Sequence, residues 1–264
     1  MFFVYLAIKA AFAGGIVLAM SLLAERLSPR VAGIVSGAPL GGLISYYILG
    51  LEEGIPFVVA SIPHAVAGMS GVMVFIAVYH EVARRGGRFQ VVNSCAASLA
   101  AQLAVSMVLS RIHFDLVGAL ALSVTSAVLA GLALRRALDV KVATPVRLTL
   151  RLLTLRAGLA AAMVLSVVGV ASVLGPAWAG VLMGFPMTLL PTMLIVNVTY
   201  SADHVNALLK GFPIGIGSVI CYVASLPWSY PAFGVHLGTL ASLLVAWSYL
   251  VAVSLVFFAL RRRR

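Results

Sequence analysis

Long apolar runs make up most of this sequence, and short polar segments separate them. A helix needs about 20 apolar residues to cross a bilayer, and its backbone polar groups must be paired within the helix. The runs therefore predict an all-α polytopic membrane protein with about nine transmembrane helices. Their expected ranges are 2–24, 31–50, 57–79, 89–110, 114–134, 149–173, 178–198, 204–226 and 236–260.

The composition supports a lipid environment and argues against a nucleic-acid binder. Hydrophobic residues make up 62% of the chain and charged residues 9%, whereas a soluble domain has about 25% charged residues. The net charge of +11 could indicate binding to phosphate backbones. However, the basic residues lie between the apolar runs or in the terminal stretch Arg261–Arg264. We therefore expect membrane lipids, and no nucleic acid, as partners.

The basic residues also predict the orientation, because cytoplasmic loops carry an excess of Lys and Arg. This rule places the N-terminus outside and the C-terminus in the cytoplasm, which requires an odd number of spans. We expect a multi-pass protein of the cytoplasmic (plasma) membrane whose first helix is retained, since no basic leader precedes it. One side carries only Arg111, and the other carries Arg26, Arg30, Arg84, Arg85, Arg88, Arg135, Arg136, Lys141, Arg147 and Arg151.

One segment of the chain occurs twice, 147 positions apart. Residues 27–50 align with residues 174–197 without a gap, and both follow the pattern L-x-P-x-x-A-G-[IV]-x-x-G-x-P-[LM]. Five spans separate equivalent helices, so the copies should have opposite orientations. This predicts a 4+1+4 inverted-topology repeat. Its parts are a first four-helix membrane repeat (1–111), a linker helix with a basic cytoplasmic loop (112–146) and a second, inverted four-helix repeat (147–264).

Short motifs in the first copy match those of a known family. They are Ile8-Lys9-Ala10-Ala11, Ala32-Gly33-Ile34, Gly37-x-Pro39, Tyr46-Tyr47-Ile48 and Glu52-Glu53-Gly54. On these residues the chain resembles the GlpM-like family of small four-helix inner-membrane proteins, over roughly residues 6–80 and more faintly over 153–225. Because its members are about half as long, the resemblance implies a fused, tandem duplication. It implies no settled biochemical activity, only an association with exopolysaccharide production.

Lys9 and Arg156 are equivalent under the repeat, and each lies about two turns inside the first helix of its copy. A charge within hydrocarbon costs at least about 2.5 kcal/mol near the bilayer centre, so such residues usually line a cavity or find a partner. One interpretation is a pair of cations that bind an anionic substrate. The other is snorkelling, in which both side chains reach the headgroups from near their helix starts.

Gly37-x-Pro39 and Gly184-x-Pro186 place helix-breaking residues within apolar spans. Proline removes a backbone donor and leaves carbonyl groups that need other partners. The pattern is typical of an unwound segment that binds substrate, and equally of a packed kink where glycine allows close approach. Ser36 and Thr188 could add polar lining beside these breaks.

Four further residues are candidates for gating or coupling: Glu52, Asp203, His64 and Lys210. Acidic side chains at helix ends are favoured by the helix dipole, so Asp203 could equally be an N-cap. Lys210 could pair with an acid or line the mouth of a pathway. His64 follows Pro63 in its span, where polar packing is the simpler role.

These observations favour a transporter or channel-like permease for a small, anionic solute, with its site between the two repeats. No catalytic or metal-binding motif occurs in a fitting context, so we expect no enzyme, cofactor or metal site. Two alternatives remain: a non-transporting membrane subunit that supports an envelope or exopolysaccharide system, and an intramembrane enzyme acting on lipid. The substrate, the coupling ion and the oligomeric state are not predicted.

Overall fold

The computed structural model describes residues 39–87, 89–136, 150–187, 189–199 and 202–262, together with Gly15. Every regular element among these residues is a helix, and none is a strand, which confirms the predicted all-α class. In chain order the elements are α3 (Leu40–Glu52), α4 (Ile55–Arg84), α5 (Gln90–Leu109), α6 (Leu116–Ala133), the short 3-10 helix η1 (Leu134–Arg136), α7 (Leu150–Leu174), α8 (Pro176–Met183), α9 (Leu189–Thr199) and α10 (Ala202–Arg262).

α10 consists of two helices that meet at Gly234. This residue has φ 71° and ψ 179°, a non-helical conformation that is essentially restricted to glycine. The two halves fold back on each other. Hydrogen bonds join them near the reversal, between Tyr230 and Thr239 and between Ser229 and Ser242. The halves correspond to the last two predicted spans.

Among the described residues, four helical segments are long and apolar enough to cross a membrane. They are α4, α5, α6 and α10, with mean hydropathies of 1.7, 1.6, 2.1 and 2.0 over their candidate segments. Large apolar side chains on α6 face outward, among them Val117 and Leu129, which are 74% and 61% exposed. Exposed apolar surface on long helices is what a lipid environment favours. The described residues therefore indicate a helical membrane protein.

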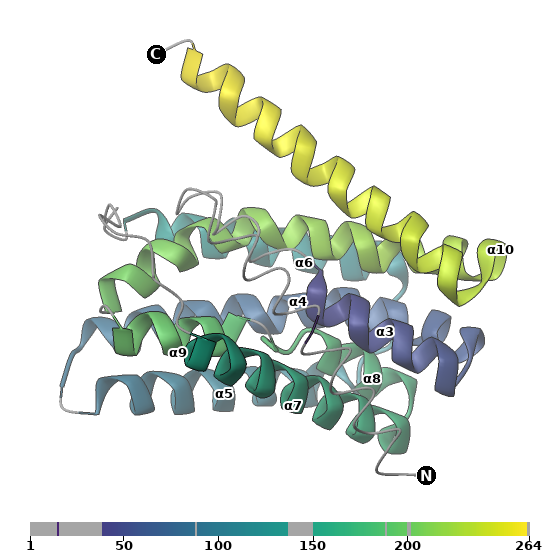
Figure 1. Ribbon diagram of the computed structural model, residues 1–264, viewed down its shortest axis with the longest axis horizontal. Helices are drawn as coiled ribbons and strands as arrows, with labels where there is room; N and C mark the ends of the chain where they lie inside the picture. The colour runs from purple at the N-terminus through teal and green to yellow at the C-terminus, as the bar shows by residue number, and fades with distance from the viewer. Residues whose placement is uncertain are drawn as a thin grey trace.

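The helices alternate in direction along one axis of the molecule (Figure 1). We call the end of the bundle that carries Arg84, Arg85 and Arg135 the arginine end; it contains the C-terminus of α4 and η1. The helices α4, α6, α8 and α9 run toward this end, and α3, α5 and α7 run away from it. The first half of α10 also runs away from the arginine end, and its second half returns.

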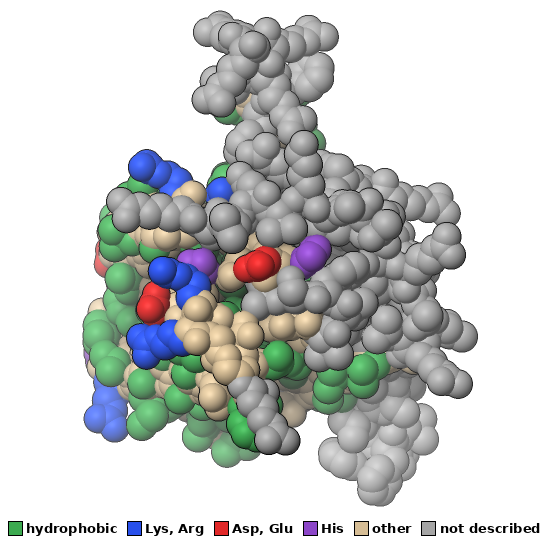
Figure 2. Space-filling model, turned by 90° about the vertical axis from the view of Figure 1, so that its left-hand side faces the viewer, with side chains coloured by type: hydrophobic (Ala, Val, Ile, Leu, Met, Phe, Trp, Pro, Cys, Tyr) green, Lys and Arg blue, Asp and Glu red, His purple; other side chains and the backbone are tan. Residues whose placement is uncertain are grey.

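The charges differ between the two ends. Figure 2 faces the arginine end and shows Lys and Arg side chains gathered there with histidines and a few acidic groups. We call the other end the opposite end; it contains the exposed residues Glu52 and Glu53 at the end of α3 and Arg111 after α5. Arg84 and Arg85 lie 3.5 and 3.6 Å from Glu81, in exposed ion pairs that contribute little stability.

α4 lies at the centre of the bundle and packs against α5, α6, α8 and α10. Its crossing with α8 is a direct backbone contact at glycine. A Cβ atom at Gly68 would lie 2.8 Å from the carbonyl oxygen of Val181, and one at Gly184 would overlap the carbonyl of Gly68. A Cβ at Gly180 would likewise overlap the backbone of Ser61. Gly180 and Gly184 thus form a GxxxG surface, which allows membrane helices to approach closely.

Candidate functional site

Both Gly-x-Pro sequences coincide with helix ends. α8 ends at Met183, and α9 starts at Leu189, so the predicted span 178–198 is two half-helices rather than one. In the first copy, Pro39 is the residue before α3, which starts at Leu40. The predicted interruption is therefore present in the second copy, whereas Gly37 lies outside the described residues.

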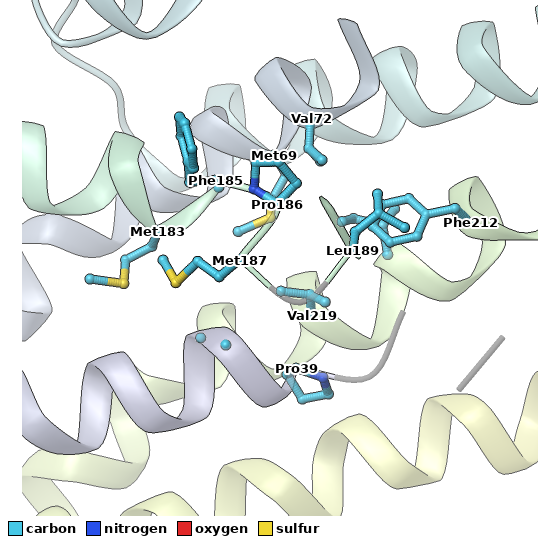
Figure 3. Close-up of a pocket in the computed structure, with 14 residues that line it drawn as sticks. Pro39, Met69, Val72, Met183, Phe185, Pro186, Met187, Leu189, Phe212 and Val219 are labelled. Carbon is cyan, nitrogen blue, oxygen red and sulfur yellow. The ribbon is translucent and has the colours of Figure 1, made fainter. Parts of the chain in front are cut away.

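A cavity of about 50 Å³ lies where these two helix ends meet (Figure 3). Its lining comes from α3, α4, the α8–α9 break and the first half of α10. The described lining residues are Pro39, Gly41, Gly42, Met69, Val72, Met183, Gly184, Phe185, Pro186, Met187, Leu189, Phe212, Ile216 and Val219.

The lining follows the internal repeat. Four pairs of lining residues are 147 positions apart in the sequence, so the two copies contribute equivalent positions to one space. These pairs are Pro39 with Pro186, Gly42 with Leu189, Met69 with Ile216 and Val72 with Val219.

The starts of two helices and the end of a third line the cavity. The first turn of α3 contributes Gly41 and Gly42, and Leu189 is the first residue of α9. Met183 and Gly184 are the last residue and the C-cap of α8. N–H groups in the first turn of a helix have no partner within that helix, and they carry the positive end of its dipole. None of the described lining residues is charged. The two helix starts favour an anion, and the C-terminal end of α8 acts against them.

Gly42 is the most open point of the lining. The residue is buried, yet no atom of the described residues lies within 4 Å of the place that a Cβ would occupy. By contrast, a Cβ at Gly41 would lie 3.4 Å from that of Met187. A side chain added at position 42 would therefore meet none of the described residues outside its own helix.

Three methionine side chains line the cavity, and two of them form one wall. Met183 and Met187 lie on one side and Met69 on another (Figure 3). The hydroxyl of Ser45 lies 3.6 Å from the sulfur of Met187. Methionine is unbranched and flexible, so this wall can rearrange around an occupant.

Gln102 supports the helix break from outside the cavity. This residue of α5 is fully buried, and its Nε2 donates to the carbonyl oxygen of Gly184 at 2.9 Å. The interruption of the helix frees that carbonyl, and within a membrane such a group needs another donor. The sequence analysis did not select Gln102, although a glutamine at the centre of an apolar run was the available signal.

Several predicted site residues lie outside what the structure describes. Lys9, Ser36, Gly37 and Thr188 are among them, so their roles stay predictions. Arg156 belongs to α7, but its side chain is not described. Whether the two predicted cations line a cavity or snorkel is therefore not tested by the geometry.

The predicted gating residues lie away from the cavity, and none belongs to its described lining. Glu52 is exposed at the C-terminal end of α3, and Asp203 is exposed in the first turn of α10, where it complements the helix dipole. Lys210 is half-buried in α10.

His64 has a packing role in this structure. Its Nε2 donates to the carbonyl oxygen of Ile112 at 3.0 Å, and its ring meets Phe114 edge-on. These contacts attach α4 to the turn between α5 and α6. At the end of that turn, Asp115 caps α6 by accepting from the N–H of Gly118.

Comparison with protein-family models, curated proteins and solved structures finds no match to this chain. The resemblance to the GlpM-like family therefore stays a prediction.

Proposed function

We propose that this chain is a permease of the cytoplasmic membrane for a small anionic solute. Its binding site is the cavity between the Gly-x-Pro sequences of two inverted four-helix repeats. The observation that carries this proposal is a space lined by equivalent residues of both copies, onto which two helix N-termini open. Transporters built from inverted repeats commonly bind their substrate where two broken helices meet.

The backbone supports an inverted repeat in three ways. First, α9 occupies the positions that correspond to α3, and α3 and α9 run in opposite directions. Second, α4 corresponds to the first half of α10, and these two also run in opposite directions. Third, Gly87 and Gly234, which are 147 positions apart, both have positive φ at a reversal of the chain.

The size of the cavity and the electrostatic field of the two helix N-termini both favour a small anion. The cavity of about 50 Å³ has room for a few waters or a small inorganic ion. Two helix N-termini supply a positive field without a buried cationic side chain. Lys9 and Arg156, if they face the repeat interface, would strengthen this field.

Polar contacts join the two halves at both ends of the bundle. At the arginine end, Asn197 donates to the hydroxyl of Tyr79, and His80 Nδ1 lies 2.9 Å from Asn206 Oδ1. At the opposite end, the Tyr47 hydroxyl lies 3.0 Å from Nδ1 of His236. Each contact joins a residue of the first copy to one of the second. Rocking one half against the other would break the contacts at one end while keeping those at the other, as alternating access requires.

Anion flux into proteoliposomes tests the proposal, with Gly42→Leu as the decisive variant. Leucine is the residue that the second copy has at the equivalent position 189. The added side chain should fill the cavity and lower the flux by at least about tenfold, while helix propensity at this position improves. The panel would contain chloride, nitrate, formate and phosphate.

Gly158→Leu is the matched control, because Gly158 is exposed on α7 and has no described atom within 4 Å of its Cβ position. This variant should transport like the wild type. Absence of flux for every anion, or equal flux in both variants, would refute the proposed site.

The exposed surface of α10 favours a second candidate function. The second half of α10 leaves the bundle, and Leu240, Leu244 and Leu255 on it are 57%, 65% and 63% exposed. A partner helix could cover this surface, as expected of a non-transporting subunit in an envelope or exopolysaccharide system. Leu244→Trp should then disrupt assembly with that system without affecting anion flux. If lipid instead faces this helix, the variant should assemble like the wild type.

A further inference from the structure

The described lining of the cavity contains no polar side chain. It consists of methionine, valine, leucine, isoleucine, phenylalanine and proline side chains together with glycine. These residues offer an occupant no hydroxyl, amide, carboxylate or amino group. Hydrogen bonds from this lining must therefore come from its backbone, because hydrocarbon and thioether groups donate none.

Three backbone N–H groups of the lining have no acceptor among the described residues. Those of Gly41 and Gly42 lie in the first turn of α3, where N–H groups have no partner within the helix. The N-cap of this helix is Pro39, which supplies no side-chain acceptor. The third N–H group belongs to Leu189, the first residue of α9.

Carbonyl groups at the break between α8 and α9 already have partners. The carbonyl oxygen of Gly184 accepts from Nε2 of Gln102 at 2.9 Å. That of Phe185 accepts from the N–H of Met187 at 2.8 Å, and that of Pro186 accepts from an N–H of α9 at 2.9 Å. The backbone around the cavity therefore has donors to spare beside acceptors that are in use, which favours an anion over a cation.

An anion in this cavity gives up most of its water, because about 50 Å³ has room for few water molecules. The described lining returns only backbone N–H groups and no charge, and the C-terminal end of α8 weakens the field of the two helix starts. The cost of dehydration then decides which anion binds. Fluoride and phosphate hold water strongly, whereas nitrate and iodide hold it weakly.

We propose that the cavity selects weakly hydrated, polarisable monovalent anions, such as nitrate and iodide, over chloride, fluoride and phosphate. The role of this selection in transport rests on the proposed function, whereas selective binding does not. The three methionine side chains suit such anions, since thioether groups are polarisable and adapt to the shape of an occupant.

Flux into proteoliposomes, with each anion at the same concentration, measures the selection. Nitrate and iodide should enter at least about tenfold faster than fluoride and phosphate, which needs only a small difference in binding free energy, and chloride should lie between them. Weakly hydrated anions also leak through lipid, so the flux of Gly42→Leu proteoliposomes is subtracted. Chloride or fluoride flux equal to that of nitrate would overturn the selection and leave the permease.

Gly42→Ser and Gly42→Ala are a matched pair at the most open point of the lining. Both add a small side chain, but only serine adds an O–H donor. Chloride accepts the stronger hydrogen bond, so the nitrate-to-chloride flux ratio should fall by about threefold in Gly42→Ser. The ratio in Gly42→Ala should stay near that of the wild type, whatever the total flux. Equal ratios in the two variants would contradict selection by dehydration.

The melting temperature in detergent separates binding from transport. Nitrate should raise it at lower concentrations than chloride does, and neither should stabilise Gly42→Leu, whose side chain fills the cavity. Nitrate stabilisation without flux of any anion would refute the permease and leave the selective site. Chloride stabilisation at lower concentrations than nitrate, or none by nitrate, would overturn the selection.

Discussion

The helix pair α4–α5 and the two halves of α10 occupy equivalent positions in the repeat, but they pack differently. Both pairs reverse at a glycine with positive φ, Gly87 in the first and Gly234 in the second. α5 then lies along α4, whereas the second half of α10 leaves the bundle (Figure 1). The reversal is therefore common to both pairs, and the packing after it is not.

Side-chain size explains the difference. α5 presents small or polar residues to α4 at every fourth position: Ser94, Ser98, Gln102 and Ser106 are all buried. The residue equivalent to Gln102 is Tyr249, whose ring meets Gly217. Small residues at an interface allow membrane helices to approach closely, and a tyrosine holds them apart. In the predicted repeat, the two hairpins therefore share their turn and differ in their contact surface.

The largest fall in stability should come from adding bulk to α4 where it crosses α8. Gly68→Val would force a side chain into the backbone of α8, because Val181 atoms lie 2.8 to 3.0 Å from the Cβ position. We expect the free energy of unfolding to fall by about 3 kcal/mol or more. At Gly217 the obstacle is the end of the Tyr249 side chain, which can swing outward, so Gly217→Val should cost about 1 kcal/mol. Denaturant unfolding in detergent micelles measures both values, and equal losses would show that the halves are equally tight.

A smaller effect should come from the equivalent polar residues. Gln102→Leu leaves the Gly184 carbonyl without a donor at a buried helix break, at a cost of about 1–3 kcal/mol. Tyr249→Phe removes a bond to the carbonyl of Ile214, which lies within a helix, and should cost about 0.5–1 kcal/mol. The same unfolding measurement compares them. If Tyr249→Phe lost more unfolding free energy than Gln102→Leu, Gln102 would not be the residue that stabilises the break between α8 and α9.

Tyr249→Gln should have the smallest effect on stability, but it should change the distance between the two halves of α10. This change gives the second hairpin the residue of the first, so the second half of α10 should move closer to the first half. Spin labels at the exposed positions Ile214 and Val251 would report the distance by electron paramagnetic resonance. An unchanged or longer distance would mean that Tyr249 does not hold the helices apart.

The apolar runs predicted most of the described helices to within a few residues. α5 and α6 start and end close to the predicted 89–110 and 114–134. Apolar composition and run length are local properties, so a single sequence contains them. The predicted break at Gly184-x-Pro186 is likewise local, because proline acts on its own turn.

The hydrogen-bond partners of polar residues could not be predicted from the sequence. Gln102 and Gly184 are far apart in the chain and meet only through the packing of α5 on α8. The contact between Tyr47 and His236 likewise depends on how α3 meets α10. Tyrosine in an apolar run indicates neither its partner nor the lack of one. The predicted cations Lys9 and Arg156 stay predictions, because the described side chains do not include them.

Gly42 and Leu189 occupy equivalent positions in the predicted repeat but differ in size, and this difference bears on the direction of transport. If the halves exchange roles as the proposed mechanism requires, the two access states are not mirror images, since one wall is bare backbone and the other carries an isobutyl group. States that differ in packing differ in free energy, so we expect one to be more populated at rest. Influx and efflux under equal and opposite gradients would then proceed at different rates, and the permease would act as a rectifier.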